Sequence, residues 1–159
     1  MRRIWLSLGS NMGDRLAHLQ WAVTALSALG LVRCSSVYET TPVGVEGQPD
    51  YLNAVVELQS NLSARELLAQ CMAIETAAGR VRNERWGART LDVDIVGIEG
   101  ERVDEPDLQI PHPRAHERDF VLIPLLELAD PAVAGLPATA PVTDAGVCAT
   151  DMNLYGSPA

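Results

Sequence analysis

Lysine is absent from this chain of 159 residues, so all 12 of its basic residues are arginine. They face 21 acidic residues, and the formal net charge is −9. Without lysine, the chain cannot use Schiff-base chemistry or the lysine of a P-loop. So acidic a chain is also not expected to have the broad basic surface that binds nucleic acid.

Aromatic residues, cysteines and long apolar runs are also scarce. Aromatic residues make up 4% of the chain, and Phe120 is its one phenylalanine. The three cysteines are odd in number and widely spaced, which favours reduced thiols over disulfides or a zinc site. The apolar stretch 4–8 is too short for a signal peptide, and the run 121–126 contains Pro124 and cannot span a bilayer. We therefore expect a cytoplasmic protein without membrane contact.

Hydrophobic periodicity predicts an α+β protein with the element order β-α-β-β-α-β. This order and an antiparallel sheet are typical of a ferredoxin-like core. The second helix begins at the predicted capping box Ser63–Glu66 and ends at Gly79. The expected strands cover residues 4–8, 32–40, 51–59 and 91–98, and the first helix covers residues 13–29.

A hairpin and helix appendage is expected after the last core strand. It comprises a hairpin around Gly100, an irregular stretch at 106–113 and a short helix near 120–128. Pro124 is expected in the first turn of that helix or at a kink. The whole chain, 1–159, is expected to form one domain, with its core at about 3–130 and a loosely structured tail at 131–159.

Two aspartates in the fourth expected strand point to metal chemistry. Asp92 and Asp94 are two residues apart, so their side chains share one face of a strand about 7 Å apart. Two such carboxylates can hold a pair of divalent cations. The alternative is an ordinary solvated strand face. Glu75 on the preceding helix is either a carboxylate that supports the metal ligands from behind or a solvated residue, and the second is the expectation.

An arginine-rich segment lies directly before these aspartates. It holds Arg80, Arg82, Arg85 and Arg89, four of the 12 arginines within ten residues. Guanidinium groups bind phosphate in a bidentate geometry, although arginine runs are often just solvated loops. The clustering in an acidic chain favours a focused anion site, and with the carboxylates it predicts chemistry on a polyphosphate.

Several motifs in order along the chain resemble the 6-hydroxymethyl-7,8-dihydropterin pyrophosphokinase family. The similarity is collinear from about Ile4 to Asp130. Its most specific part is Arg85-Trp86-Gly87-Ala88-Arg89-Thr90-Leu91-Asp92-Val93-Asp94-Ile95. The other segments are Leu8-Gly9-Ser10-Asn11, Tyr38-x-Thr40-x-Pro42-x-Gly44, Gln48-Pro49-Asp50-Tyr51-Leu52-Asn53-Ala54, Ile110-Pro111-His112 and Arg118-Asp119-Phe120-Val121-Leu122-x-Pro124-Leu125.

The resemblance implies transfer of pyrophosphate from ATP to 6-hydroxymethyl-7,8-dihydropterin, which gives AMP and the pterin diphosphate in folate biosynthesis. Two Mg²⁺ ions would be held by Asp92 and Asp94, and ATP would be the co-substrate. The implied catalytic residues are Arg80, Arg89, Asp92 and Asp94. The implied ATP-binding residues are Arg80, Arg82, Trp86, Arg89, Ile95, His112 and Arg118. The implied pterin-binding residues are Thr40, Thr41, Pro42, Val43, Tyr51, Asn53, Trp86 and Phe120.

Two other classes of function stay open at this point. One is an ordinary kinase or a nucleotidyltransferase that acts on another small heteroaromatic alcohol. The other is a non-catalytic ferredoxin-like module that binds RNA or a small effector, although the chain has no RRM-type aromatic motif. For the leading hypothesis the partners are small-molecule substrates, with no nucleic acid and no membrane, and the protein is expected to be a monomer.

Overall fold

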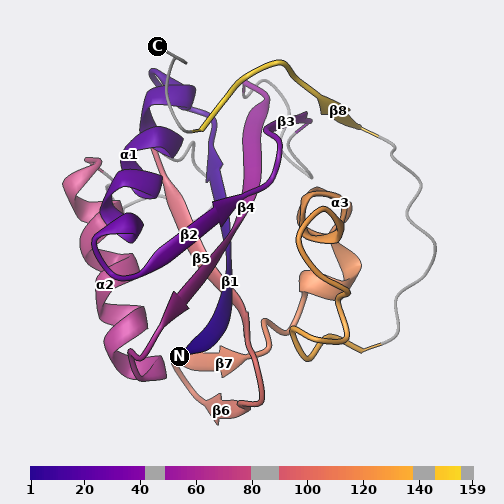
Figure 1. Cartoon of the computed structure of the whole chain (residues 1–159). Coiled ribbons are helices and arrows are strands. Elements are labelled where there is room, and N and C mark those ends of the chain that lie inside the picture. Colours follow the sequence, from indigo (N-terminus) through magenta and orange to yellow (C-terminus); the bar gives the residue numbers. More distant parts are fainter. Residues whose placement is uncertain (42–48, 80–89, 138–145, 155–159) are drawn as a thin grey trace.

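The computed structural model describes residues 1–41, 49–79, 90–137 and 146–154 (Figure 1). The strands are β1 (Arg2–Ser10), β2 (Leu31–Cys34), β3 (Tyr38–Thr40), β4 (Tyr51–Ser60), β5 (Asp92–Ile98), β6 (Val103–Glu105), β7 (Leu108–Ile110) and β8 (Val147–Ala149). The helices are α1 (Arg15–Ser27), α2 (Ala64–Ala77) and α3 (Asp119–Leu126), with a 3-10 turn at Ala115–Glu117.

A six-stranded antiparallel sheet forms the middle layer of the molecule. Its strand order is β5-β1-β4-β3-β8, and β2 also pairs with β4. Helices α1 and α2 lie on one face of this sheet, and α3 lies on the other (Figure 1). The predicted α+β class with an antiparallel sheet is therefore confirmed.

Apolar clusters fill the space on both sides of the sheet. Ile4, Leu6 and Leu8 of β1 pack toward α1 and α2, together with the alternate residues of β4. Trp5 points the other way and packs with Val55 beneath α3. Each of these two strands thus divides its side chains between the two clusters, because side chains alternate between the faces of a sheet.

Strand β5 contains one extra residue near its end. Leu6 lies opposite Ile95, and the neighbouring Trp5 lies opposite Gly97. Val96 is therefore the additional residue of a β-bulge. As a result, Ile98 packs on the side of α1 and α2 like Ile95, although three residues separate them, while Val96 packs on the α3 side.

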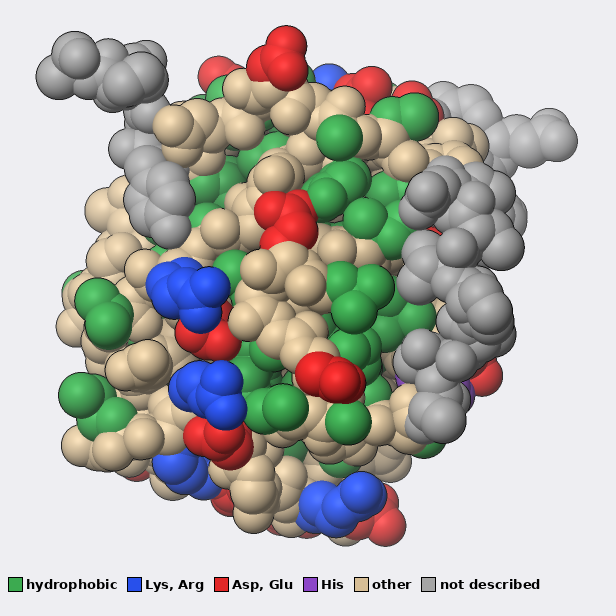
Figure 2. Space-filling view, turned by 45° about the vertical axis from the view of Figure 1, so that its right-hand side comes forward, with side chains coloured by type: hydrophobic (Ala, Val, Ile, Leu, Met, Phe, Trp, Pro, Cys, Tyr) green, Lys and Arg blue, Asp and Glu red, His purple; other side chains and the backbone are tan. Residues whose placement is uncertain are grey.

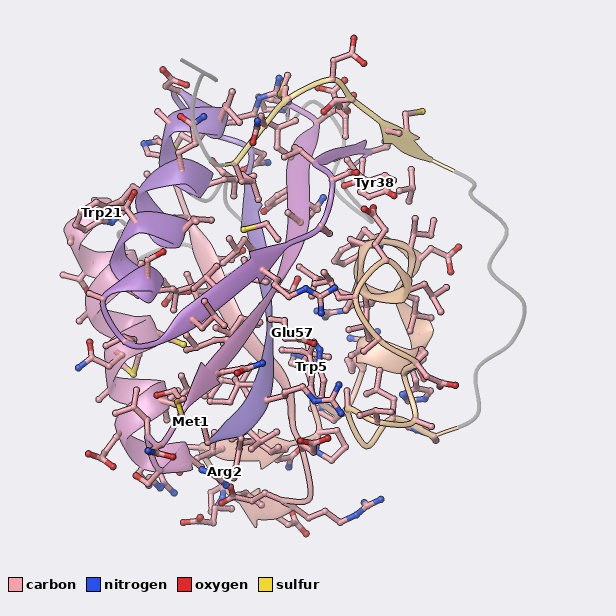
Figure 3. All side chains as sticks on the ribbon, in the orientation of Figure 1. Met1, Arg2, Trp5, Trp21, Tyr38 and Glu57 are labelled. Carbon is pink, nitrogen blue, oxygen red and sulfur yellow. The ribbon has the colours of Figure 1, made fainter. Side chains whose placement is uncertain are left out.

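A buried carboxylate lies between the sheet and α3. Glu57 of β4 is 2% exposed, and its side chain points toward Trp5 (Figure 3). The indole N–H of Trp5 donates to Glu57 Oε1 at 3.1 Å, and Arg33 donates to Oε2 at 3.0 Å. Both carboxylate oxygens thus have donors, as a buried carboxylate requires.

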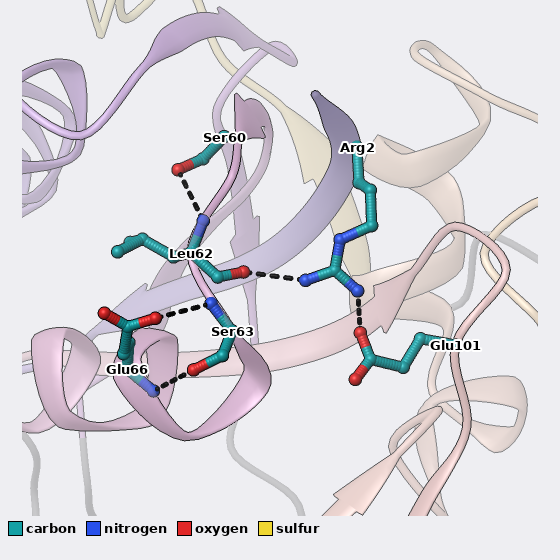
Figure 4. Close-up of polar contacts among 6 residues, drawn as sticks. All are labelled: Arg2, Ser60, Leu62, Ser63, Glu66 and Glu101. Atoms are coloured by element: carbon teal, nitrogen blue, oxygen red, sulfur yellow. Dashed lines mark hydrogen bonds and ion pairs between the residues drawn. The ribbon is translucent and has the colours of Figure 1, made fainter.

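The predicted capping box at the start of α2 is confirmed (Figure 4). The backbone N–H of Glu66 donates to Ser63 Oγ at 3.1 Å, and the N–H of Ser63 donates to Glu66 Oε1 at 3.0 Å. These hydrogen bonds from Ser63 hold the pKa of Glu66 below its usual value. Beside the cap, Arg2 donates to the carbonyl of Leu62 at 2.7 Å and pairs with Glu101, so β1 is tied to the beginning of α2 (Figure 4).

The predicted second strand, 32–40, is divided into β2 and β3. Ser35 stands at the break, where its N–H donates to the carbonyl of Val55 and its Oγ accepts from the N–H of Val55, both at 2.9 Å. The side chain thus replaces a backbone acceptor. Because a side chain takes the place of a backbone carbonyl at Ser35, the hydrogen-bond ladder with β4 is interrupted between β2 and β3.

One expectation for residues 106–128 is wrong. The stretch expected to be irregular contains β7, which pairs with β6 and buries Leu108 and Ile110 while Gln109 stays exposed. This alternation is the pattern of a half-buried strand. Of the two places expected for Pro124, the first turn is excluded, because Pro124 is the sixth residue of α3.

The segment after residue 130 is attached to the core more closely than the sequence predicts. Ala134 and Leu136 are buried beneath α3, and Leu154 is buried in the cluster on the opposite side of the sheet. Strand β8 pairs with β3. The N–H of Thr150 also donates to the carbonyl of Val37 at 3.0 Å.

Basic and acidic side chains are interspersed on the face shown in Figure 2. Ion pairs join Arg3 to Glu99 and Arg65 to Glu105 and Asp107. Within the described ranges, no helix is both long enough and apolar enough to cross a bilayer.

Candidate active site

Asp92 and Asp94 lie on the first half of β5. The residues between and after them, Val93 and Ile95, are buried against α1 and α2. Strand alternation therefore turns both aspartates to the opposite face of the sheet. Asp94 is exposed and Asp92 is half-buried. The structure thus brings the two carboxylates to one face, as their spacing predicts.

Glu75 of α2 supports this segment from the other side. The prediction that it is solvated is wrong: Glu75 is 3% exposed, and its Oε2 accepts the N–H of Val93 at 2.8 Å. Its bond is made to the backbone between the two aspartates. The sequence does contain a signal, because Glu75 follows Cys71 by four residues and so continues the buried stripe of the helix.

Cys71 lies in the same region and is chemically inert. Burial raises the pKa of its thiol to about 12, and the carboxylates of Glu75 and Asp94 add to the effect. The thiolate is the reactive form of cysteine, so this thiol is a poor nucleophile near neutral pH.

Three residues predicted to contact the pterin meet where β3 and β4 adjoin. Thr40 lies opposite Tyr51, and the side-chain amide of Asn53 donates to Thr40 Oγ1 at 2.5 Å. Asn53 is 4% exposed, while Tyr51 is half-buried. The next residue, Thr41, is exposed and donates its N–H to the carbonyl of Gly146 at 3.3 Å.

Gly9 connects this polar group to the aspartates. It lies opposite Asn53 of β4 on one side and opposite Asp92 of β5 on the other. Neighbouring strands are about 4.8 Å apart, so Asn53 and Asp92 are separated by about 10 Å across the sheet. A Cβ on Gly9 would be 3.0 Å from Asn53 Oδ1 and 3.5 Å from Tyr51 Cδ1. The absence of a side chain leaves room for those two residues on the face between the strands.

Phe120 and Arg118 approach the same face from α3. Phe120 is half-buried against the apolar cluster beneath the helix. The guanidinium carbon of Arg118 is 5.7 Å from the centroid of the Phe120 ring, a cation–π distance. The arginine predicted to bind ATP and the phenylalanine predicted to stack on the pterin are therefore neighbours.

His112 is anchored by its backbone and by its ring. Its N–H donates to the carbonyl of Val96 at 2.8 Å, and its Nδ1 accepts the N–H of Arg114 at 3.1 Å. Burial lowers the pKa of His112 to about 4, and the nearby Arg118 and Arg114 contribute. The ring is thus neutral near pH 7, with its proton on Nε2, which is a donor.

We expect an NMR titration of the His112 ring to show a midpoint near pH 4. Because its pKa in the folded protein is below its unfolded value of about 6.5, the unfolded chain binds the proton first as the pH falls. The folded state should therefore lose stability from about pH 6.5 toward pH 4, and His112→Gln should reduce that loss in urea unfolding curves. A titration midpoint near 6.5 would contradict the buried, neutral ring.

The structure does not bring every predicted site residue to this face. Ile95 is 6% exposed and packs in the cluster beneath α1 and α2, on the side opposite the aspartates. Several other predicted or candidate residues lie outside the described residues: Pro42, Val43, Arg80, Arg82, Arg85, Trp86 and Arg89.

Known proteins resemble this chain over most of its length. Residues 5–130 match the family model described as 7,8-dihydro-6-hydroxymethylpterin-pyrophosphokinase (HPPK). A 2-amino-4-hydroxy-6-hydroxymethyldihydropteridine pyrophosphokinase of Bacillus subtilis is 45% identical over 127 residues, which cover 78% of this chain and 76% of the relative. The enzyme of the same name from Methylorubrum extorquens is 44% identical over 138 residues, covering 85% of this chain and 87% of the relative.

Solved structures resemble the fold. An HPPK-DHPS in complex with substrates matches with a TM-score of 0.54 at 13% identity, and a Plasmodium falciparum HPPK-DHPS matches with 0.56 at 14%. Each match covers 80% of this chain, and the chain spans 40% of each of those longer proteins. The family match and the identities to the bacterial enzymes lead to one assignment: the chain belongs to the 7,8-dihydro-6-hydroxymethylpterin-pyrophosphokinase family.

Proposed function

We propose that this chain transfers pyrophosphate from ATP to 6-hydroxymethyl-7,8-dihydropterin through the face that carries Asp92, Gly9 and Asn53. The pterin hydroxymethyl oxygen attacks the β-phosphorus of ATP, and the bond to the oxygen that bridges the α- and β-phosphates breaks. AMP leaves and the hydroxyl proton is released. The observation that carries the proposal is the row across β5, β1 and β4, in which Gly9 lies between Asp92 and the buried amide of Asn53.

The acceptor side of the site uses β3 and β4. Asn53 donates one N–H to Thr40, and its Oδ1 and second N–H are the groups that match the amide-like edge of a pterin. Tyr51 and Phe120 supply aromatic faces for stacking, which contributes about 0.5–1.5 kcal/mol beyond burial. The missing side chain at Gly9 leaves space for a flat ring. Thr41, and beyond it Pro42 and Val43, complete the proposed acceptor pocket.

The phosphate side of the site uses the aspartates of β5. Among the described residues, no group of three or more His, Cys, Asp or Glu side chains could hold a metal. Mg²⁺ is commonly bound by one or two carboxylates together with waters and substrate phosphates, so Asp92 and Asp94 fit as its protein ligands. When bound, two Mg²⁺ ions held by Asp92 and Asp94 would supply positive charge that neutralises the phosphates.

Arginine and histidine side chains complete the proposed ATP site. The neutral ring of His112 donates from Nε2 to a phosphate oxygen, and Arg118 adds positive charge beside it. The residues Arg80, Arg82, Trp86 and Arg89 are proposed ATP contacts from their place in the family motif. Arg80 and Arg89 are also proposed to stabilise the charge that develops in the transition state.

We also propose the finer description of the fold and of the working protein. The sheet would be a ferredoxin-like core in which β2 and β3 together are the second strand, since both pair with β4. Residues 1–159 would form one domain, and the protein would act as a monomer in the cytoplasm. Cys34, Cys71 and Cys148 form no disulfides within the described residues, which is in keeping with a reducing compartment.

Nucleotide product analysis tests this function. Purified protein is incubated with ATP and Mg²⁺, with and without 6-hydroxymethyl-7,8-dihydropterin, and the nucleotides are separated by chromatography. We expect AMP to form only when the pterin is present. ADP would identify an ordinary kinase, and pyrophosphate a nucleotidyltransferase. No turnover by the folded protein would favour the non-catalytic binding module.

A further inference from the structure

Arg15, the first residue of α1, joins two segments that are far apart in the sequence. Its Nη1 donates to Glu39 Oε2 at 2.9 Å and to the carbonyl of Asp50 at 2.8 Å. The arginine side chain is 27% exposed, and that of Glu39 is 38% exposed. These contacts link the beginning of α1 to β3 and to the residue directly before β4.

The two contacts fall on either side of the polar group proposed to bind the pterin. Glu39 precedes Thr40 in β3, and Asp50 precedes Tyr51 in β4. Thr40 and Tyr51 lie opposite each other, and Thr40 receives the hydrogen bond of Asn53. Arg15 therefore holds both strand ends that carry these three side chains.

A second side chain from the same region makes a parallel contact. Asn11, which directly follows β1, is 1% exposed and donates its side-chain amide to the carbonyl of Pro49 at 3.3 Å. Strand β3 has only three residues, so its own ladder gives it few hydrogen bonds. Contacts from outside the ladder then have a large share in fixing where Thr40 lies.

We propose that Arg15 is a positioning residue for pterin binding. It acts by holding the end of β3 against the start of β4, so that Thr40, Tyr51 and Asn53 keep the arrangement that the acceptor needs. This inference rests on the proposed function, because the pterin is the ligand assigned to those three residues. The partners of Arg15, Glu39 and the carbonyl of Asp50, belong to the acceptor side of the site, so its effect is expected on the acceptor.

The matched control is Arg65. Like Arg15, Arg65 lies in the first turn of a helix, here α2. It forms ion pairs with Glu105 and Asp107 of the β6–β7 hairpin. Neither that hairpin nor the first turn of α2 carries a proposed site residue. Arg65→Ala therefore removes ion pairs of the same kind without touching the strands that bind the pterin.

The experiment measures steady-state kinetics with both substrates, and thermal unfolding, for the full chain and its variants. We expect Arg15→Ala to raise KM for the pterin about tenfold, equivalent to about 1.4 kcal/mol, with kcat and KM for ATP changed less than about twofold. Arg15→Lys can still donate to one of the two partners, so its KM for the pterin should lie between those of the unmodified protein and Arg15→Ala. Glu39→Gln, which keeps a neutral acceptor, should raise KM for the pterin less than Arg15→Ala does. Arg65→Ala should leave both KM values unchanged.

Failure of the inference and failure of the function give different results. If the unmodified protein forms no AMP with the pterin, both the proposed function and the role of Arg15 are refuted. If it forms AMP, and Asn53→Ala raises KM for the pterin while Arg15→Ala and Glu39→Gln do not, the function stands and the role of Arg15 is refuted. Equal rises in KM for both substrates, or the same rise in Arg65→Ala, would also refute it, because either result indicates general loss of structure.

Discussion

Replacing Asp94 by alanine should lower turnover by about 10³-fold or more while the protein stays folded. Asp94 is exposed on β5, so its carboxylate is not needed for packing. Surface substitutions of this kind usually change stability by about 0.5 kcal/mol or less. The loss should therefore appear in kcat, measured as AMP formed from ATP with the pterin at saturation, with little change in the melting temperature.

Asp104→Ala is the matched control for this prediction. Asp104 is also an exposed aspartate in a strand, β6, but that strand carries no proposed site residue. Its replacement should leave AMP formation unchanged. If Asp94→Ala instead kept normal turnover and lost much of its thermal stability, its carboxylate would be a structural group and the proposed metal site would be wrong.

A large loss of stability is expected from Gly97→Ala in β5. A Cβ at this position would be 2.1 Å from the carbonyl oxygen of Ala134 and 3.0 Å from its carbonyl carbon. Both are backbone atoms, so no side-chain rotation can make room. Overpacking of this kind costs about 1–3 kcal/mol and sometimes more. With about 2–4 °C per kcal/mol for a protein of this size, the melting temperature should fall by about 10 °C.

A second substitution distinguishes a clash with the backbone of Ala134 from a clash with its side chain. Ala134→Gly removes the Cβ of Ala134, which would lie 3.1 Å from the new methyl group, but leaves the carbonyl in place. The double variant should therefore be no more stable than Gly97→Ala alone. Recovery of the melting temperature in the double variant would contradict the assignment of the clash to the backbone.

Most of the core arrangement could be predicted because it follows from local patterns. The alternation in β1 and β4 identified which residues face the helices, and Ser63 with Glu66 identified the beginning of α2. The break between β2 and β3 could not be predicted, because it depends on a hydrogen bond between Ser35 and the distant Val55. The close approach of Gly97 to Ala134 is equally non-local and has no pattern in the sequence.

The candidate site could be predicted in its parts but not in its arrangement. Spacing alone placed Asp92 and Asp94 on one face of a strand. Their position beside Asn53, with Gly9 between, depends on the register of three strands, which the sequence does not specify. The burial of Glu75 was missed because a glutamate near a helix end is usually solvated, whereas here it receives a backbone N–H from β5.

Strand β8 has a consequence for the order in which the chain can complete its fold during synthesis. Its residues pair with β3, whose Thr40 lies opposite Val147, so the ribosome adds the partner roughly a hundred residues after β3 itself. At about 5–20 residues per second, β3 then keeps an unpaired edge for on the order of 5–20 s. An unpaired edge strand can pair with other chains. The nascent protein is therefore most exposed to misassembly at the strand that carries its acceptor-binding threonine, and a chaperone that shields strand edges would act there.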